Sequence, residues 1–131
     1  MTRFSIRSSL VLAAAGLLAA FAAMAASSDP SGKWRIVFDH WAENDGELVL
    51  RIAPLNGTSI DVTTKVTKNM TENHVADLAK GALKAQLGKG YKVEVDDGED
   101  VLIKKTGKTP KFTVTLVSSS VTGLEIKIRH D

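Results

Sequence analysis

Apolar and polar side chains alternate along most of the chain beyond residue 32, with the period of two that is typical of half-buried β-strands. The pattern predicts three strands ahead of the only helical segment and three or four strands after it. The first three are expected over residues 33–41, 47–54 and 59–66. The later ones are expected over residues 91–96, 101–105, 112–116 and 124–129. We expect the apolar side chains of these strands to line a common core.

A single segment, residues 71–87, repeats its apolar side chains every three or four positions, which is typical of an amphipathic helix. Thr71 is predicted to cap the N-terminus of this helix, and Gly88 to end it. Because a helix with one apolar stripe must cover a surface, we expect it to pack across the sheet. The stripe consists of Val75, Leu78, Ala79, Ala82, Leu83 and Leu87.

Short turn signals predict which strands are neighbours. The pairs Asp45-Gly46 and Asn56-Gly57 are typical of hairpin turns, so the first three strands are predicted to form an antiparallel meander. We therefore expect an α+β fold in the order βββαβββ(β), with a mainly antiparallel sheet of six or seven strands and one amphipathic helix on one face. One helix cannot cover so wide a sheet, and part of a sheet face is expected to stay open.

The first segment of the chain, residues 1–25, has the pattern of a signal peptide. Arg3 and Arg7 precede an apolar run, and Ala23 and Ala25 supply the small residues that a signal peptidase recognises. The alternative is a retained membrane anchor, since the run is nearly long enough to span a thin bilayer. The polar residues that follow the run favour cleavage.

Cleavage leaves one folded unit. We expect a flexible leader over residues 26–32 and a single α+β domain over residues 33–131, because about 100 residues form one domain. The product is expected to be periplasmic or secreted, with no stable membrane span after cleavage of the signal peptide.

Loss of the signal peptide also balances the charge of the chain. The sequence holds 17 Lys and Arg against 15 Asp and Glu, and removal of Arg3 and Arg7 makes the two counts equal. Net charge therefore gives no reason to expect nucleic acid, and a protein is the expected partner. The chain has no cysteine, which excludes disulfides and thiolate chemistry. It holds no phosphate-binding or dinucleotide-binding glycine motif, and we expect no cofactor.

The end of the first predicted strand holds the best candidate binding residues. His40 follows Asp39, a pairing that general acid–base chemistry uses. Trp34 and Trp41 lie seven residues apart, so they are predicted to face opposite sides of the strand, one buried and one exposed. We expect a binding site at this first hairpin, formed by Asp39, His40, Trp41 and Glu43.

The densest acidic cluster of the sequence lies at the predicted turn between the strands at 91–96 and 101–105. Oxygen ligands of this kind suit Ca²⁺, and we expect weak calcium binding or a solvated hairpin turn, since the spacing is not that of an EF-hand. The cluster consists of Asp96, Asp97, Glu99 and Asp100. The lysines of the next loop are predicted to lie at the opposite end of the same hairpin, which separates charge along it.

The succession of a strand, a helix opening with Thr71-Glu72-Asn73-His74-Val75-Ala76 and the later hairpins resembles small exported bacterial proteins of unknown function over residues 33–128. It is also similar to the strand–helix–hairpin modules of phage tail proteins, which lack a signal peptide. Neither resemblance implies an activity or a site residue.

Together these observations lead us to expect a non-enzymatic exported module of the bacterial envelope, with a binding or structural role. It would act through an open sheet face or an edge strand that adds to a partner. The alternative is a small secreted hydrolase or hydrolase inhibitor that uses the first hairpin around His40.

Overall fold

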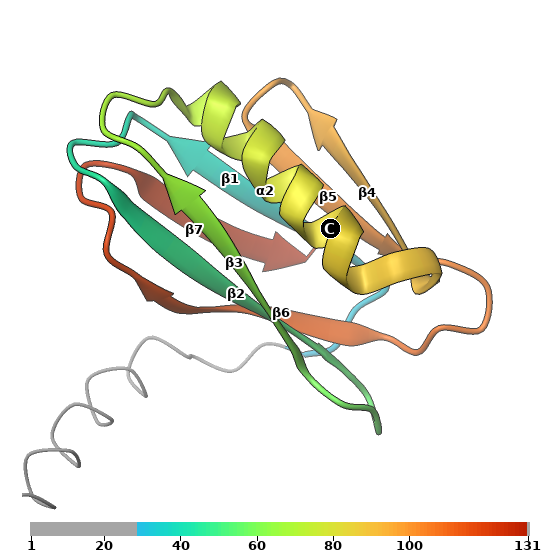
Figure 1. Ribbon diagram of the computed structural model, residues 1–131. Coiled ribbons are helices and arrows are strands. Elements are labelled where there is room, and N and C mark those ends of the chain that lie inside the picture. Colours follow the sequence, from blue (N-terminus) through green and yellow to red (C-terminus); the bar gives the residue numbers. More distant parts are fainter. Residues whose placement is uncertain (1–28, 131) are drawn as a thin grey trace, which may run out of the picture.

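The computed structural model describes residues 29–130, so the predicted signal peptide and the first part of the leader lie outside the described residues. Within that range the chain forms seven antiparallel strands and one α-helix in the order βββαββββ (Figure 1), which confirms the expected α+β class. The strands are β1 (Lys33–Asp39), β2 (Gly46–Pro54), β3 (Ile60–Val66), β4 (Tyr91–Asp96), β5 (Asp100–Lys105), β6 (Phe112–Ser119) and β7 (Glu125–His130). The helix is α2 (Glu72–Leu87), and the short 3-10 turn η2 (Gly88–Gly90) follows it.

The strands are divided between two sheets instead of forming one. The first sheet has the order β4-β5-β1-β7 and the second the order β3-β2-β6. The meander is therefore confirmed for β2 and β3, but the prediction that β1 forms a hairpin with β2 is wrong. The segment between β1 and β2 instead bonds to the residues just before α2. Ala42 N donates to Met70 O, and Asn69 N donates to Ala42 O. These contacts tie this segment to the approach of the helix and carry the chain from one sheet to the other.

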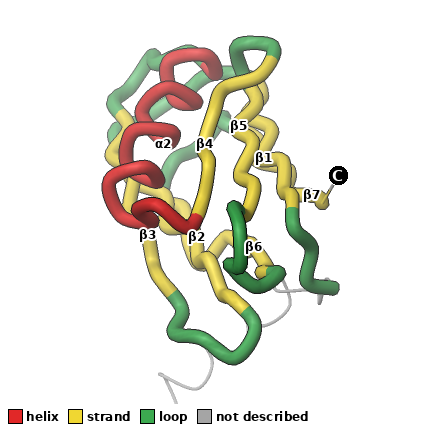
Figure 2. The backbone as a smooth tube through the Cα atoms, turned by 90° about the vertical axis from the view of Figure 1, so that its right-hand side faces the viewer, coloured by secondary structure: helices red, strands yellow, loops and turns green. Residues whose placement is uncertain are grey.

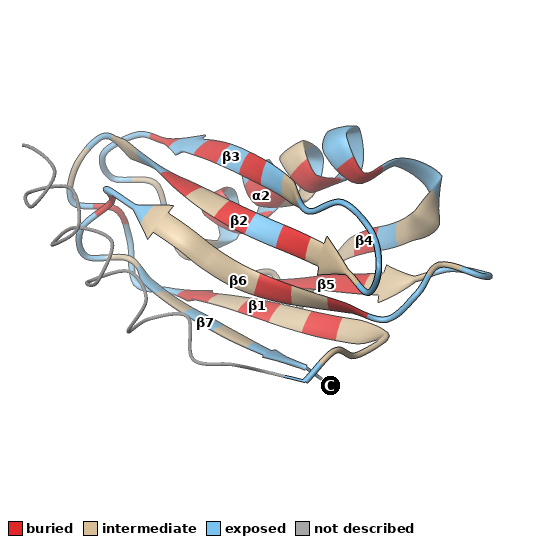
Figure 3. Ribbon diagram, turned by 90° about the horizontal axis from the view of Figure 1, so that it is seen from below, coloured by how far each residue is buried: buried red, intermediate tan, exposed pale blue. Residues whose placement is uncertain are grey.

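The apolar faces of the two sheets lie toward each other and form the core. Buried and less buried residues alternate along β1 and β2 as the sequence predicted (Figure 3). Trp34 is fully buried, and its Nε1 donates to Phe112 O at 2.7 Å, which connects β1 of one sheet to β6 of the other. Within residues 29–130 the large apolar side chains that remain exposed are Trp41, Leu55 and Leu78. The described part of the chain therefore leaves no broad apolar surface on either sheet, and a role for an open sheet face stays a prediction.

Helix α2 lies between β3 and β4, which are edge strands of different sheets (Figure 2). Thr71 is confirmed as the N-cap, because its side chain accepts a hydrogen bond from His74 N. Gly88 ends the helix as predicted, with a φ of 70° and its N–H bonded to Lys84 O. The capped helix thus closes one side of the space between the sheets.

The buried face of α2 differs from the predicted stripe at one position. Leu78 was expected to be buried, but 36% of its surface is exposed. Because the helix packs against two sheets, the small residues Ala76 and Ala79 face inward and allow a close approach. Leu78 lies beside this face and is only partly covered. The buried residues are Val75, Ala76, Ala79, Leu83 and Leu87.

Candidate functional site

The structure brings His40 close to two carboxylates where β1 ends. His40 Nε2 lies 4.0 Å from Asp39 Oδ2 and 3.7 Å from Glu125 Oε2. The backbone N of His40, which has a φ of 66°, donates to Asp39 Oδ1 at 2.9 Å. Among residues 29–130 these three side chains form the group whose ligand atoms are near enough to share a metal ion. All three side chains are at least half exposed, so water has direct access to the cluster.

The other two predicted binding residues are placed differently. Glu43 N donates to Thr122 O at 2.9 Å, and the Glu43 side chain covers Gly123, which has a φ of 85° and no room for a Cβ. Trp41 is 59% exposed, which confirms that Trp34 is buried and Trp41 is not. The hydrolase or inhibitor alternative around His40 stays a prediction.

Glu125, and not Glu43, is the second carboxylate near His40. It lies directly opposite Asp39 in the pairing of β1 with β7. The alternation of residues 124–129 predicted a strand, but no pattern in the sequence indicates which other strand it pairs with. A contact that depends on strand pairing could therefore not be predicted.

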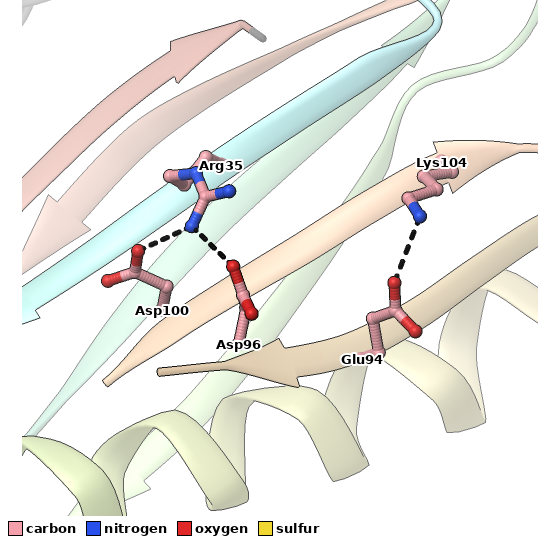
Figure 4. Close-up of polar contacts among 5 residues, drawn as sticks. All are labelled: Arg35, Glu94, Asp96, Asp100 and Lys104. Atoms are coloured by element: carbon pink, nitrogen blue, oxygen red, sulfur yellow. Dashed lines mark hydrogen bonds and ion pairs between the residues drawn. The ribbon is translucent and has the colours of Figure 1, made fainter. Parts of the chain in front are cut away.

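The four carboxylates of the acidic cluster lie at the tip of the β4–β5 hairpin, as predicted. Arg35 Nη1 of β1 lies 2.6 Å from Asp100 Oδ2 and 3.0 Å from Asp96 Oδ2 (Figure 4). A calcium ion would have to compete with this guanidinium for both carboxylates, leaving Asp97 and Glu99 as the remaining acidic ligands of the cluster. The geometry favours an ion-paired turn, and calcium binding stays a prediction.

A groove lies between α2 and β4. It encloses about 610 Å³. The lining consists of Lys80 and Lys84 of the helix, residues 91–95 of β4 and Thr106. Because η2 leads directly from the helix into β4, helix and strand run antiparallel (Figures 1 and 2). The groove follows the strand, since residues 91–95 all line it.

The two ends of the α2–β4 groove are structurally distinct. At one end Thr106 N donates to Gly90 O at 3.0 Å and Thr106 Oγ1 donates to Lys89 O at 2.9 Å, which fixes η2 to the end of β5. At the other end a Cβ on Gly98 would lie 3.2 Å from the side-chain amide of Asn73. The start of the helix therefore lies beside the acidic hairpin tip.

The backbone of β4 presents unpaired groups at alternate residues. The bond from Thr106 N to Gly90 O joins residues directly opposite each other in the antiparallel register. Since bonded and non-bonded pairs alternate along such a ladder, the peptide groups of Tyr91, Val93 and Val95 point away from β5. β4 is an edge strand, so no further strand pairs with these groups within residues 29–130.

The side chains around the groove are mainly basic. Lys80, Lys84 and Lys92 line it, and among the described residues none of them forms an ion pair. Glu94 is the one carboxylate in the lining, and its Oε1 lies 3.0 Å from Lys104 Nζ (Figure 4). The hydrogen bond from Lys104 holds the pKa of Glu94 below its usual value. The negative charge in the groove is therefore already paired, whereas the three positive charges are not.

Tyr91 provides a spectroscopic probe of the groove, because it is the only tyrosine in the chain. Its ring packs edge-on against Phe112, with centroids 5.1 Å apart, and burial raises the pKa of the Tyr91 hydroxyl. We expect phenolate absorbance in the folded protein to appear at higher pH than in urea, where the pKa returns to about 10. The stability that this pKa shift contributes is present in full below about pH 10. It is lost as the pH rises through the higher pKa that Tyr91 has in the folded protein. Equal midpoints with and without urea would contradict this prediction.

The helix found in residues 29–130 is too short and too polar to cross a membrane. No known family model matches the chain, and a search among curated proteins finds no match.

Proposed function

We propose that this protein is a non-enzymatic exported binding module of the bacterial envelope, which adds an extended segment of a protein partner to the edge of β4. The α2–β4 groove is the main support for this proposal. It follows β4, whose peptide groups at Tyr91, Val93 and Val95 point away from β5. Main-chain hydrogen bonds give affinity in this mode of recognition, and the side chains beside the strand give specificity.

β4 is better suited to strand addition than the edge strands β6 and β7, which the helix does not border, and the groove opens along β4 and not along β3. Helix α2 borders β4 along its length, so an added segment would lie between a strand and a helix and would be partly enclosed. Exposed strand edges also promote unwanted association, and the charged side chains of Lys92 and Glu94 limit this on β4. A partner must therefore satisfy both the backbone and these charges.

The remaining parts of the proposal come from the sequence. The pattern of residues 1–25 supports export to the periplasm or beyond, and the balanced charge after cleavage gives no support for nucleic acid as a partner. No cofactor enters this function, since strand addition needs only peptide groups and side chains. An extended protein segment is the partner that such a groove accepts.

Site-specific photo-cross-linking in the bacterial envelope tests this function. We expect a cross-linking amino acid in place of Lys92 to give a discrete adduct with another protein, because this side chain lines the groove. The same amino acid in place of Lys127, which is exposed on β7, serves as the matched control. Adducts of equal yield from both positions, or none from position 92, would count against the proposal. The mass of the adduct-free protein checks removal of residues 1–25.

A further inference from the structure

We infer that the α2–β4 groove binds an acidic extended segment, whose carboxylates lie against Lys80, Lys84 and Lys92 while its backbone pairs with β4. This inference rests on the proposed function and specifies the chemistry of the partner. It is carried by charge complementarity, by the spacing of the lysines and by the charge difference between the two ends of the groove.

None of the lysines of the groove forms an ion pair within the described structure, although Lys92 is near enough to Glu94 to help lower its pKa. Lys80 and Lys84 lie one turn apart on α2, and Lys92 follows on β4. The one acidic side chain of the lining, Glu94, is paired with Lys104. An incoming carboxylate would thus meet three cations and one anion that is already neutralised. Positively charged side chains of a partner would be repelled by the three lysines.

The spacing of Lys80 and Lys84 matches the repeat of a β-strand. Four residues of α-helix rise about 6 Å, and two residues of an extended strand rise about 6.7 Å. Side chains at alternate positions of an added strand point to the same side. Two carboxylates separated by one residue can therefore face Lys80 and Lys84 together, while the peptide groups between them pair with β4.

Charge also changes along the groove. Lys84 and Lys92 lie toward the end closed by Thr106, whereas the acidic tip around Gly98 lies at the other end. Desolvation raises the pKa of Glu99, and the nearby carboxylate of Glu72 at the helix start raises it further, which indicates a negative potential there. The acidic part of the segment should therefore lie at the Thr106 end.

Nucleic acid and free polyanions fit this groove less well than a peptide. Stacking of bases requires exposed aromatic faces, and the one aromatic residue of the lining, Tyr91, is half-buried and packs against Phe112. A polyanion has no peptide groups to pair with Tyr91, Val93 and Val95. The paired backbone is thus the feature that distinguishes a protein segment from other anions.

Synthetic peptides test the inference on the purified protein. The probes are a capped peptide that alternates glutamate with valine, the same peptide with lysine in place of glutamate, and the glutamate peptide methylated at alternate backbone nitrogens. Inorganic polyphosphate is the fourth probe. We expect the unmethylated glutamate peptide to bind and to slow amide exchange at Tyr91, Val93 and Val95. The amides of Lys92 and Glu94 already pair with β5, so their exchange should change little.

Charge reversal in the groove should weaken binding of the glutamate peptide. We expect Lys84→Glu and Lys92→Glu to lower its affinity about threefold each, and about tenfold together. Lys68→Glu alters the net charge equally at an exposed loop away from the groove and should leave the affinity unchanged. Lys92→Glu does not touch the helix, so it keeps the test valid if Lys84→Glu loosens the last helical turn.

The outcomes separate the inference from the function on which it rests. Equal binding and equal amide protection by the lysine peptide would overturn the charge inference and leave strand addition standing. Binding that survives backbone methylation without amide protection would overturn strand addition. Polyphosphate binding that depends on the same lysines and exceeds that of the glutamate peptide would assign the groove to free polyanions. Absence of binding by every probe would overturn both proposals.

Discussion

Replacement of Leu83 by aspartate is expected to unfold the domain. Leu83 is fully buried on α2, where the helix faces both sheets. Loss of a buried leucine side chain costs about 2–5 kcal/mol, and an isolated carboxylate in its place adds several kcal/mol more. The sum reaches the total stability of about 5–15 kcal/mol that a small domain has. Circular dichroism and urea denaturation should show a largely unfolded protein without a cooperative transition.

Leu78→Asp is the matched control for this prediction. It makes the same chemical change five residues earlier on the same helix, but Leu78 is 36% exposed. We expect the free energy of unfolding to fall by about 1–2 kcal/mol, clearly less than for Leu83→Asp, because the carboxylate stays hydrated and only part of the leucine packing is lost. If the two variants were equally destabilised, or if Leu83→Asp remained folded, the assigned orientation of the helix would be wrong.

Arg35→Ala is expected to cause the second large loss of stability. The guanidinium holds Asp96 of β4 and Asp100 of β5 against β1 (Figure 4). The side chains of Arg35 and Asp100 are only 14% and 11% exposed. Removal of the guanidinium therefore leaves the largely buried carboxylate of Asp100 without this ion pair. We expect the free energy of unfolding in urea to fall by about 2–4 kcal/mol.

Arg51→Ala tests whether burial causes this effect. Arg51 also bonds a carboxylate, with its Nε 2.8 Å from Asp61 Oδ1, but both side chains are nearly half exposed. Exposed pairs contribute about 1 kcal/mol or less, so the loss should be clearly smaller than for Arg35→Ala. Similar losses for the two variants would mean that the ion pair at the hairpin tip owes little to its burial.

Local patterns were sufficient to predict the elements of this fold. The alternation of residues 33–41 placed Trp34, Ile36 and Phe38 on one face, and all three are buried. The N-cap at Thr71 and the end of the helix at Gly88 could also be predicted, because both depend on neighbouring backbone groups. These features need no information about distant parts of the chain.

Features that depend on distant partners were not predictable from one sequence. The division into two sheets, the exposure of Leu78 and the position of Glu125 beside His40 all follow from which strands pair. The α2–β4 groove was missed for a similar reason, since it depends on the unpaired side of an edge strand. Lys80 and Lys84, one turn apart on a helix that leads directly into a strand, were the signal that could have indicated it.

The pairing of β1 with β5 and β7 has a consequence for biosynthesis. β1 is translated before the other strands of residues 29–130, yet both of its neighbours belong to the second half of the chain. Contacts so far apart in sequence form slowly, because the intervening loop must be closed first. The core of the nascent polypeptide is therefore not complete until β7 has been translated, so most of the chain leaves the ribosome before it can fold.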